Sequence, residues 1–208
     1  MPQKSTGTYP SFQEYAERTL EEVKQTVSKI DPSEATAFCD AIRGKSGRKI
    51  YVIGEGRSGL AGKMFAQRLS HLGFEKVYAY GDTVIPAISA EDLVISISGS
   101  GETDNTCNMA SKAREIGAYV VAVTSFPKST LGRTAQLVVC IPGRTKISRG
   151  LSYDARQLAG EHEPLNPLGT IFELAVHLFL DQIVNMIAVA EKLTEEEVLS
   201  HHIQDWKT

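Results

Sequence analysis

The amino-terminal part of the chain shows helical periodicity. Apolar side chains recur at three- and four-residue intervals from Phe12 to about Ile30, which predicts an amphipathic helix. The run Asp31-Pro32-Ser33-Glu34 then supplies an N-cap residue, a proline at the first helical position and a glutamate at the third. A second helix is therefore expected to extend to about Arg43. Residues 1–10, which contain Pro, Gly, Ser and Thr, are expected to form a flexible tail.

From residue 49 onward, short apolar runs alternate with amphipathic segments. The apolar runs are rich in β-branched residues and lack polar alternation, which is typical of strands buried on both faces of a parallel sheet. The segments between them predict helices at about Ser58–Leu72, at Thr103–Ile116 and, in a short form, from Ser129. The five expected strands are Lys49–Ile53, Lys76–Tyr80, Leu93–Ile97, Tyr119–Thr124 and Leu137–Ile141.

A long apolar helix is expected at Leu168–Glu191, after a proline-rich stretch at residues 161–167. Its central part, Ile171–Ala190, contains a glutamate, a histidine and an aspartate. Because charges at the centre of a bilayer are costly, we interpret this segment as a buried helix and not as a membrane span. A capping-box pattern that starts at Thr194 predicts one last short helix.

Alternating strands and helices predict an α/β fold, a doubly wound five-stranded parallel sheet flanked by helices and preceded by a helical segment. The flavodoxin-like strand order 2-1-3-4-5 would place a switch point between the first and third strands, where ligands bind outside the carboxyl ends. The two glycine-rich loops of the chain follow these two strands. We expect a single domain over residues 11–208, with its core at about 31–190, because no linker-like segment divides the middle.

Composition narrows the classes of function. The 208 residues, 42% of them hydrophobic and 23% charged, suffice for one full core, and a formal net charge of −3 is too small to indicate a nucleic-acid partner. The three cysteines are widely spaced and form neither a zinc or redox motif nor a disulfide framework. No secretory signal is visible, so the expected location is the cytoplasm, without a membrane partner.

The first glycine-rich loop, Gly54–Gly59, matches the pattern G-x-G-x-x-G. Two interpretations stay open for it. One is a tight strand-to-helix turn that binds nothing. The other is a dinucleotide site, in which Asp82, just past the second strand, would hold the ribose. A dinucleotide-dependent oxidoreductase is therefore one alternative class of function.

The second loop, which runs from Ser98 to Thr103, is more specific. Ser98, Ser100 and Thr103 supply three hydroxyl groups, while Gly99 and Gly101 let backbone N–H groups turn toward one point at the start of a helix. Helix capping alone needs one hydroxyl. Because no Walker lysine follows the glycines, triphosphate hydrolysis is not expected. The loop therefore predicts a site for a phosphomonoester of a small molecule, with its glutamate turned away from the anion.

Three segments together resemble the sugar isomerase (SIS) domain family: Tyr51–Gly59, Ser96–Thr103 and Gly160–Thr170. The third, with Arg68–Phe74 and Pro142–Lys146, is similar to the 6-phospho-3-hexuloisomerase branch of that family. This resemblance implies a homotetramer that converts 3-hexulose 6-phosphate to fructose 6-phosphate through an enediol, without a metal or a cofactor. A different SIS sugar phosphate isomerase and a non-catalytic sugar phosphate-binding regulator remain alternatives.

The resemblance also implies roles for individual residues. Glu163 and His71 would be the catalytic pair. Two features depart from the family pattern: Glu55 stands where a small residue is more frequent, and the tail from about Glu195 extends beyond the pattern. The substrate-binding set that the resemblance implies is Gly56, Arg57, Ser58, Ser98, Gly99, Ser100 and Thr103.

The two catalytic candidates differ in their placement. Glu163 lies between His162 and a proline, in a stiff segment, and a carboxylate beside an anchored sugar can move a proton between adjacent carbons. His71 follows Ser58 by 13 residues on one expected helix, which separates it from its own loop by about 20 Å. If it is catalytic, it must enter a neighbouring subunit's site. The apolar faces of the helix at Leu168–Glu191 favour a buried subunit interface.

Overall fold

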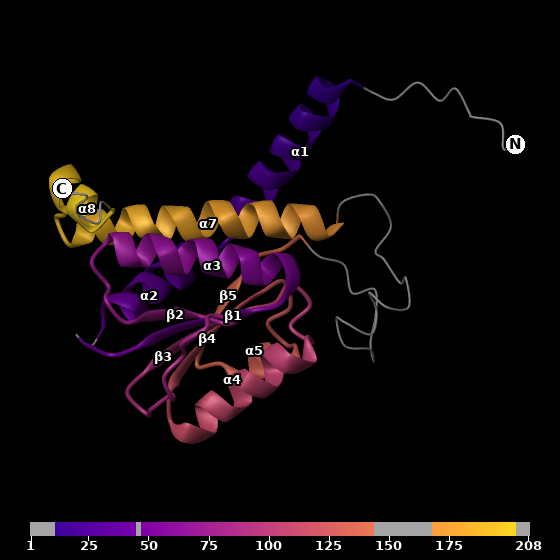
Figure 1. The fold of residues 1–208 in the computed structure, drawn as a ribbon. Coiled ribbons are helices and arrows are strands. Elements are labelled where there is room, and N and C mark those ends of the chain that lie inside the picture. The colour runs from indigo at the N-terminus through magenta and orange to yellow at the C-terminus, as the bar shows by residue number, and fades with distance from the viewer. Residues whose placement is uncertain (1–10, 45–46, 144–167, 203–208) are drawn as a thin grey trace, which may run out of the picture.

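Five parallel strands form one sheet in the order β2-β1-β3-β4-β5 in the computed structural model, which describes residues 11–44, 47–143 and 168–202 (Figure 1). This arrangement confirms the predicted α/β class and strand order. Both ends of each expected strand agree with the structure within one residue, and the second strand is one residue shorter at each end. The strands are β1 Ile50–Gly54, β2 Val77–Ala79, β3 Leu93–Ile97, β4 Tyr119–Thr124 and β5 Leu137–Cys140.

Helices cover both faces of the sheet (Figure 1). Alternate residues of the central strands point to opposite faces, so β1 presents Ile50 and Val52 to one hydrophobic core and Tyr51 and Ile53 to another. The first core includes side chains of α2, α3 and α7, and the second includes side chains of α4 and α5. The helices are α1 Phe12–Val27, α2 Pro32–Arg43, α3 Gly56–His71, α4 Asp104–Ile116, α5 Thr130–Thr134, α7 Leu168–Ala190 and α8 Glu195–His202.

Helix α7 packs into the core, as predicted for this apolar segment. By length and composition alone it could cross a membrane, but half of the apolar stretch Thr170–Ala190 is buried inside the molecule. Its side chains Phe172, Val176, Phe179 and Ile183 belong to the same core cluster as α2 and α3. The apolar character of α7 is therefore accounted for in part by packing against the sheet layer.

The edge strand β5 is covered by α2. Asp31 caps this helix as predicted, and its carboxylate accepts a hydrogen bond from the Ser33 backbone N–H at 2.8 Å. In the expected capping arrangement, Glu34 would also accept a hydrogen bond from the backbone N–H of Asp31. In the structure Glu34 makes a longer-range contact instead. Glu34 accepts a hydrogen bond from the backbone N–H of Cys140, on the edge of the sheet, at 2.7 Å. One carboxylate thus joins the amino-terminal helices to the last strand.

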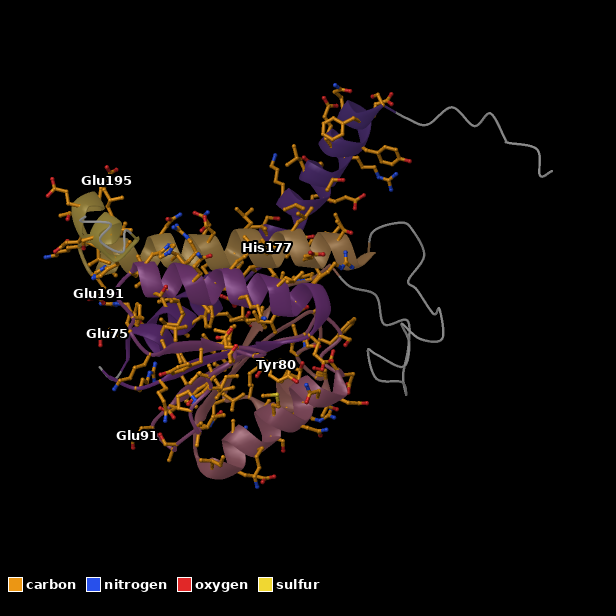
Figure 2. The ribbon with its side chains drawn as sticks, viewed as in Figure 1. Glu75, Tyr80, Glu91, His177, Glu191 and Glu195 are labelled. Carbon is orange, nitrogen blue, oxygen red and sulfur yellow. The ribbon has the colours of Figure 1, made fainter. Side chains whose placement is uncertain are left out.

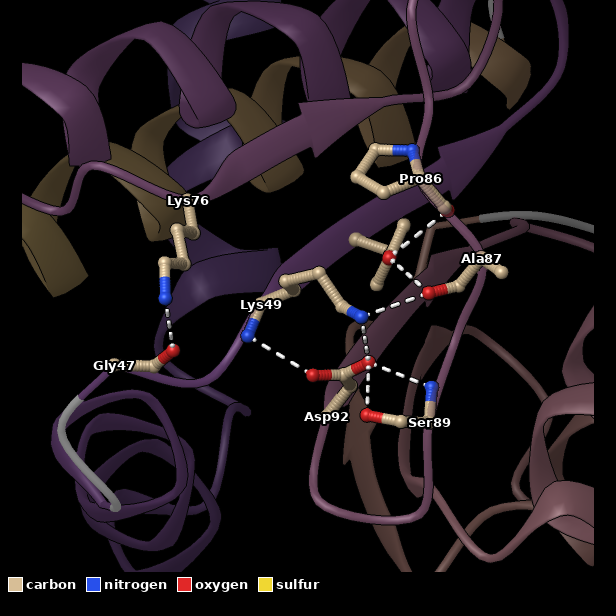
Figure 3. A network of polar contacts seen from close by, with 8 residues as sticks. Gly47, Lys49, Lys76, Pro86, Ala87, Ser89 and Asp92 are labelled. Carbon is tan, nitrogen blue, oxygen red and sulfur yellow. Dashed lines mark hydrogen bonds and ion pairs between the residues drawn. The ribbon is translucent and has the colours of Figure 1, made fainter.

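A polar network holds the amino ends of β1 and β3 together (Figure 3). Asp92 is only 2% exposed, and its carboxylate accepts hydrogen bonds from the backbone N–H groups of Lys49 at 3.0 Å and Ser89 at 2.7 Å. The Lys49 ammonium lies 3.0 Å from the same carboxylate and donates to the Ala87 carbonyl at 2.7 Å. The carboxyl ends of these two strands carry the glycine-rich loops, so the network orients the site from the opposite edge.

Replacing Asp92 by Asn should destabilise the fold and flatten its acid sensitivity. Burial alone raises the pKa of Asp92, but the hydrogen bonds from Ser89 and Lys49 outweigh it and hold the pKa below the ordinary value of 3.8. The carboxylate therefore stabilises the fold fully above that value, and this contribution is lost as the pH falls through the lower folded-state pKa.

For Asp92→Asn we expect a loss of roughly 2–4 kcal/mol in the free energy of unfolding at pH 7, since the amide has one acceptor oxygen in place of two and leaves some of the donors around Asp92 without their charged acceptor. Urea unfolding at pH 7, and again at several values below pH 4, measures both effects. The exposed aspartate Asp40, changed to Asn, serves as a control. A variant as stable as the parent at pH 7 would contradict the assigned role.

Candidate active site

Three hydroxyl groups converge after β3, in the loop that the sequence singled out for phosphate. Ser98 is 2% exposed, and its Oγ lies 2.9 Å from Thr103 Oγ1 and 3.5 Å from Ser100 Oγ. Thr103 is the N-cap residue of α4, yet its side chain makes no capping hydrogen bond. The hydroxyls therefore gather at the positive end of a helix without being used to cap it, an arrangement suited to an anion.

The loop is shaped by a close approach that needs glycine at position 101. Gly101 has a φ of +64°, and a Cβ there would lie only 1.9 Å from Oγ of the buried Ser129. Ser129 in turn caps α5 by accepting a hydrogen bond from the Gly132 N–H at 3.2 Å. The Leu131 N–H donates to the Gly101 carbonyl at 3.0 Å, so the start of α5 supports the loop from behind.

The Glu102 carboxylate is turned away from the loop, and the nearby Cys107 thiol is kept neutral. The Glu102 carboxylate accepts a hydrogen bond from the Thr130 N–H at the start of α5, at 3.2 Å, in keeping with the expectation that it points away from the anion. Burial raises the pKa of the Cys107 thiol to about 11, so the thiol stays protonated at neutral pH. It donates to the Gly101 carbonyl at 3.4 Å, behind the hydroxyl cluster.

Replacing Ser98 by Ala should weaken phosphate binding more than it affects the fold. Ser98 Oγ accepts a hydrogen bond from the Gly101 N–H at 3.2 Å, so the substitution removes one hydroxyl from the cluster and one acceptor from the loop. We expect the KM for a sugar phosphate to rise about tenfold or more, since each lost hydrogen bond to a charged group is worth about 1.5–3 kcal/mol.

The measurement for Ser98→Ala is a substrate titration, accompanied by a melting curve. Ser111→Ala, on the exposed face of α4, is the matched control and should leave KM unchanged. An unchanged KM in the Ser98 variant would remove this hydroxyl from the candidate site.

The glycines of the first loop are explained by the turn between β1 and α3. A Cβ on Gly59 would lie 2.5 Å from the Gly54 carbonyl oxygen, and Gly56, with a φ of +55°, is the first residue of α3. Asp82 accepts a hydrogen bond from the Ala79 N–H at 2.8 Å and closes the turn after its own strand. A tight strand-to-helix turn thus accounts for the G-x-G-x-x-G motif. Asp82, which would have to hold the ribose of a dinucleotide, is already used to close a turn.

Arg57 and Ser58 lie in the first turn of α3, next to the start of α7. The Arg57 guanidinium lies 2.8 Å from the Glu173 carboxylate and donates to the Thr170 hydroxyl at 3.3 Å, both on α7. These two contacts hold the amino end of α7 against the first turn of α3. Gly56, Arg57 and Ser58 are thereby placed together at the carboxyl edge of the sheet.

The two glycine-rich loops are joined by a side-chain bridge that the sequence reasoning missed. Asn105, in the first turn of α4, donates through Nδ2 to the Glu55 carboxylate at 2.9 Å and to the Tyr80 hydroxyl oxygen at 3.0 Å. Tyr80 follows β2 and lies apart from Glu75 and Glu91, which mark the amino edge of the sheet (Figure 2). The sequence shows only that a polar residue, Asn105, stands two positions after Thr103. It does not show that Glu55 and Tyr80 are its hydrogen-bond partners.

The proposed catalytic pair is only partly described. His71 is the last residue of α3, and Gly56 is the first, so the helix separates His71 from the loops of its own chain as expected. Glu163 and His162 lie outside the described residues. In the part of the chain that the structure describes, no group of three or more His, Cys, Asp or Glu side chains is placed to hold a metal ion.

Known proteins match most of this chain. The model of the SIS domain family matches residues 45–159. The chain is 34% identical to a 3-hexulose-6-phosphate isomerase of Bacillus subtilis, over 91% of this chain and 96% of that protein. It is 41% identical to an uncharacterized protein of Aeropyrum pernix, over 94% and 92% of the two chains.

A solved structure is also similar. It is the crystal structure of a hypothetical protein from Methanococcus jannaschii, for which a function of 3-hexulose-6-phosphate isomerase was inferred. The TM-score is 0.69 at 27% identity, and the match covers 92% of this chain and 97% of that one.

Proposed function

The chain belongs to the SIS domain family, and from this premise we propose that it is an isomerase that converts 3-hexulose 6-phosphate to fructose 6-phosphate. Relatives that carry the name 3-hexulose-6-phosphate isomerase match it along most of its length at 34–35% identity. The observation that carries the proposal is the convergence of the Ser98, Ser100 and Thr103 hydroxyls at the amino end of α4. This cluster would anchor the 6-phosphate and leave the sugar to extend toward Gly56–Ser58.

The reaction needs one proton to move between two carbons. In our proposal the Glu163 carboxylate removes the proton from C2 of the 3-keto sugar, which gives an enediol, and returns a proton to C3. The hydroxyl proton moves from O2 to O3, so that the carbonyl passes from C3 to C2. A carboxylate that is positioned beside an anchored substrate can perform both carbon steps without a metal ion.

We place His71 in the site of a neighbouring subunit, where it would transfer the hydroxyl proton. Leu60, Met64 and His71 are spaced by four and seven residues, so they share one face of α3. On that face Leu60 is 61% exposed and Met64 57% exposed. A second subunit that covers these two side chains would also reach His71. The homotetramer implied by the resemblance to the SIS family would supply such a neighbour.

Leu174 and Leu178 of α7 are also exposed apolar side chains, four residues apart on one helical face. Helices α3 and α7 contact each other along their length (Figure 1). Exposed apolar patches of this kind are typical of protein–protein interfaces. They support the proposal that subunits associate through these two helices.

The direct test is to incubate the protein with 3-hexulose 6-phosphate and to measure the fructose 6-phosphate that forms. Turnover supports the proposal. Turnover of a different sugar phosphate alone would indicate another isomerase activity of the SIS family. Tight binding of sugar phosphates without any isomerisation would instead indicate a non-catalytic regulator.

A further inference from the structure

We propose that Glu55 is a specificity-determining residue, whose carboxylate binds a hydroxyl at the sugar end of the substrate and disfavours a second anionic group there. The inference rests on the proposed function, since it concerns the same candidate site. Glu55 directly follows β1 at the switch point of the sheet, within the first of the two glycine-rich loops. It is the one acidic residue of the loop Gly54–Gly59.

The Glu55 side chain is held by Asn105, which is itself held by Tyr80. It stands at the N-cap position of α3 but makes no capping hydrogen bond. Instead, its Oε1 accepts the hydrogen bond from Asn105 at 2.9 Å, and the same amide group reaches the Tyr80 hydroxyl at 3.0 Å. The carboxylate is therefore fixed toward the first turn of α4, two residues beyond the phosphate loop.

The bridge leaves hydrogen-bonding capacity on both sides of Asn105. Its amide nitrogen has two protons, and the two contacts use both of them. The second carboxylate oxygen, Oε2, has no hydrogen bond or ion pair with the described residues, and the Tyr80 hydroxyl still has its own proton to donate. An acceptor and a donor at this point match a sugar hydroxyl, which both accepts and donates.

The charge of Glu55 gives this contact its selectivity. Among the described residues no Lys or Arg forms an ion pair with Glu55, since the neighbouring Arg57 pairs with Glu173; the neutral amide of Asn105 is the hydrogen-bond donor to Glu55, which stands at the α3 amino terminus. A hydroxyl gains a charge-assisted hydrogen bond to this carboxylate, whereas a phosphate in the same place meets a like charge. The site should thus favour a monophosphate over a bisphosphate.

The test compares the binding of fructose 6-phosphate and fructose 1,6-bisphosphate to the parent and to Glu55→Gln by calorimetry. Gln keeps the length of the side chain and an oxygen for Asn105, but it removes the charge and presents N–H donors. The parent should bind the monophosphate at least tenfold more tightly. In Glu55→Gln, monophosphate affinity should fall about tenfold or more, and the preference over the bisphosphate should shrink toward unity. Glu115→Gln, at an exposed position of α4, is the matched control.

A second set of variants separates selectivity from a merely structural bridge. If Asn105 acts by positioning Glu55, Asn105→Ala should reduce the preference for the monophosphate in the parent but not further in Glu55→Gln. Melting curves show whether each variant folds. A preference that stays within twofold of the parent's in folded Glu55→Gln, or a parent that binds both ligands equally, overturns the inference. Because binding can be measured whether or not the protein isomerises the bound sugar, a parent that binds selectively but does not isomerise contradicts the proposed function alone.

Discussion

Two inactive variants, Glu163→Gln and His71→Ala, should regain isomerase activity when their subunits are mixed within one oligomer. Glu163→Gln alone should lose about 10²–10⁴-fold in kcat, the usual contribution of a general base, while substrate still binds. His71→Ala should also lose activity, because the hydroxyl proton has no carrier. In a mixed oligomer, some sites combine an intact Glu163 from one subunit with an intact His71 from its neighbour.

The expected recovery follows from the placement of His71 at the far end of α3. With random mixing of equal amounts, up to about a quarter of the sites in a symmetric oligomer would hold both intact residues. Subunits can be mixed by co-expression, and kcat is then measured with 3-hexulose 6-phosphate. Oligomers that contain only one of the two variants provide the control. Full activity of Glu163→Gln would refute its role as the base, and absence of recovery would place His71 outside the neighbour's site.

Gly101→Ala should disrupt the phosphate loop and cost more stability than the substitution Gly117→Ala, at another glycine with a positive φ. The added Cβ would lie 1.9 Å from Ser129 Oγ and 2.9 Å from Thr124 Oγ1, and it would sit on a residue with a φ of +64°. A left-handed backbone costs an alanine roughly 1–2 kcal/mol. Overpacking adds about 1–3 kcal/mol, so the free energy of unfolding should fall by about 2–5 kcal/mol.

Gly117→Ala is the matched control for Gly101→Ala. Gly117 also has a positive φ, of +102°, but an added Cβ there would lie 3.0 Å from the Ala90 Cβ and 3.6 Å from its Cα, with no closer contact. It should therefore cost less, and KM for the sugar phosphate should stay unchanged, whereas it should rise at least 100-fold in Gly101→Ala. Urea unfolding and substrate titration measure the two effects. Equal losses in the two variants would show that backbone strain alone, and not contact with Ser129, sets the cost.

The elements of the fold could be predicted because each depends on a local pattern. The β-branched runs at Leu93–Ile97 and Tyr119–Thr124 coincide with β3 and β4, since strands buried on both faces tolerate few polar side chains. The predicted start of α3, at Ser58, is two residues late, because glycine is more frequent in loops than at the first position of a helix. In the structure Gly56 begins the helix with a positive φ.

The hydroxyl cluster was predictable for the same reason, since Ser98, Ser100 and Thr103 lie within six residues of one another. Contacts between distant residues were not. Glu55 and Asn105 are 50 positions apart, and Glu34 and Cys140 are 106 apart. Local patterns of hydrophobic and polar residues contain no information about contacts at such separations. The assignment of Glu163 rests on resemblance to the SIS family and stays a prediction.

The bond between Glu34 and Cys140 has a consequence for how copies of this chain can meet. An exposed edge strand offers unpaired N–H and C=O groups that can recruit a strand from another molecule and start aggregation. At β5 the Cys140 N–H is already taken by Glu34, and α2 lies against the strand. At the opposite edge, β2 has three residues and offers little length for pairing. Strand addition is thus discouraged at both edges of the sheet, which leaves helix surfaces for orderly assembly.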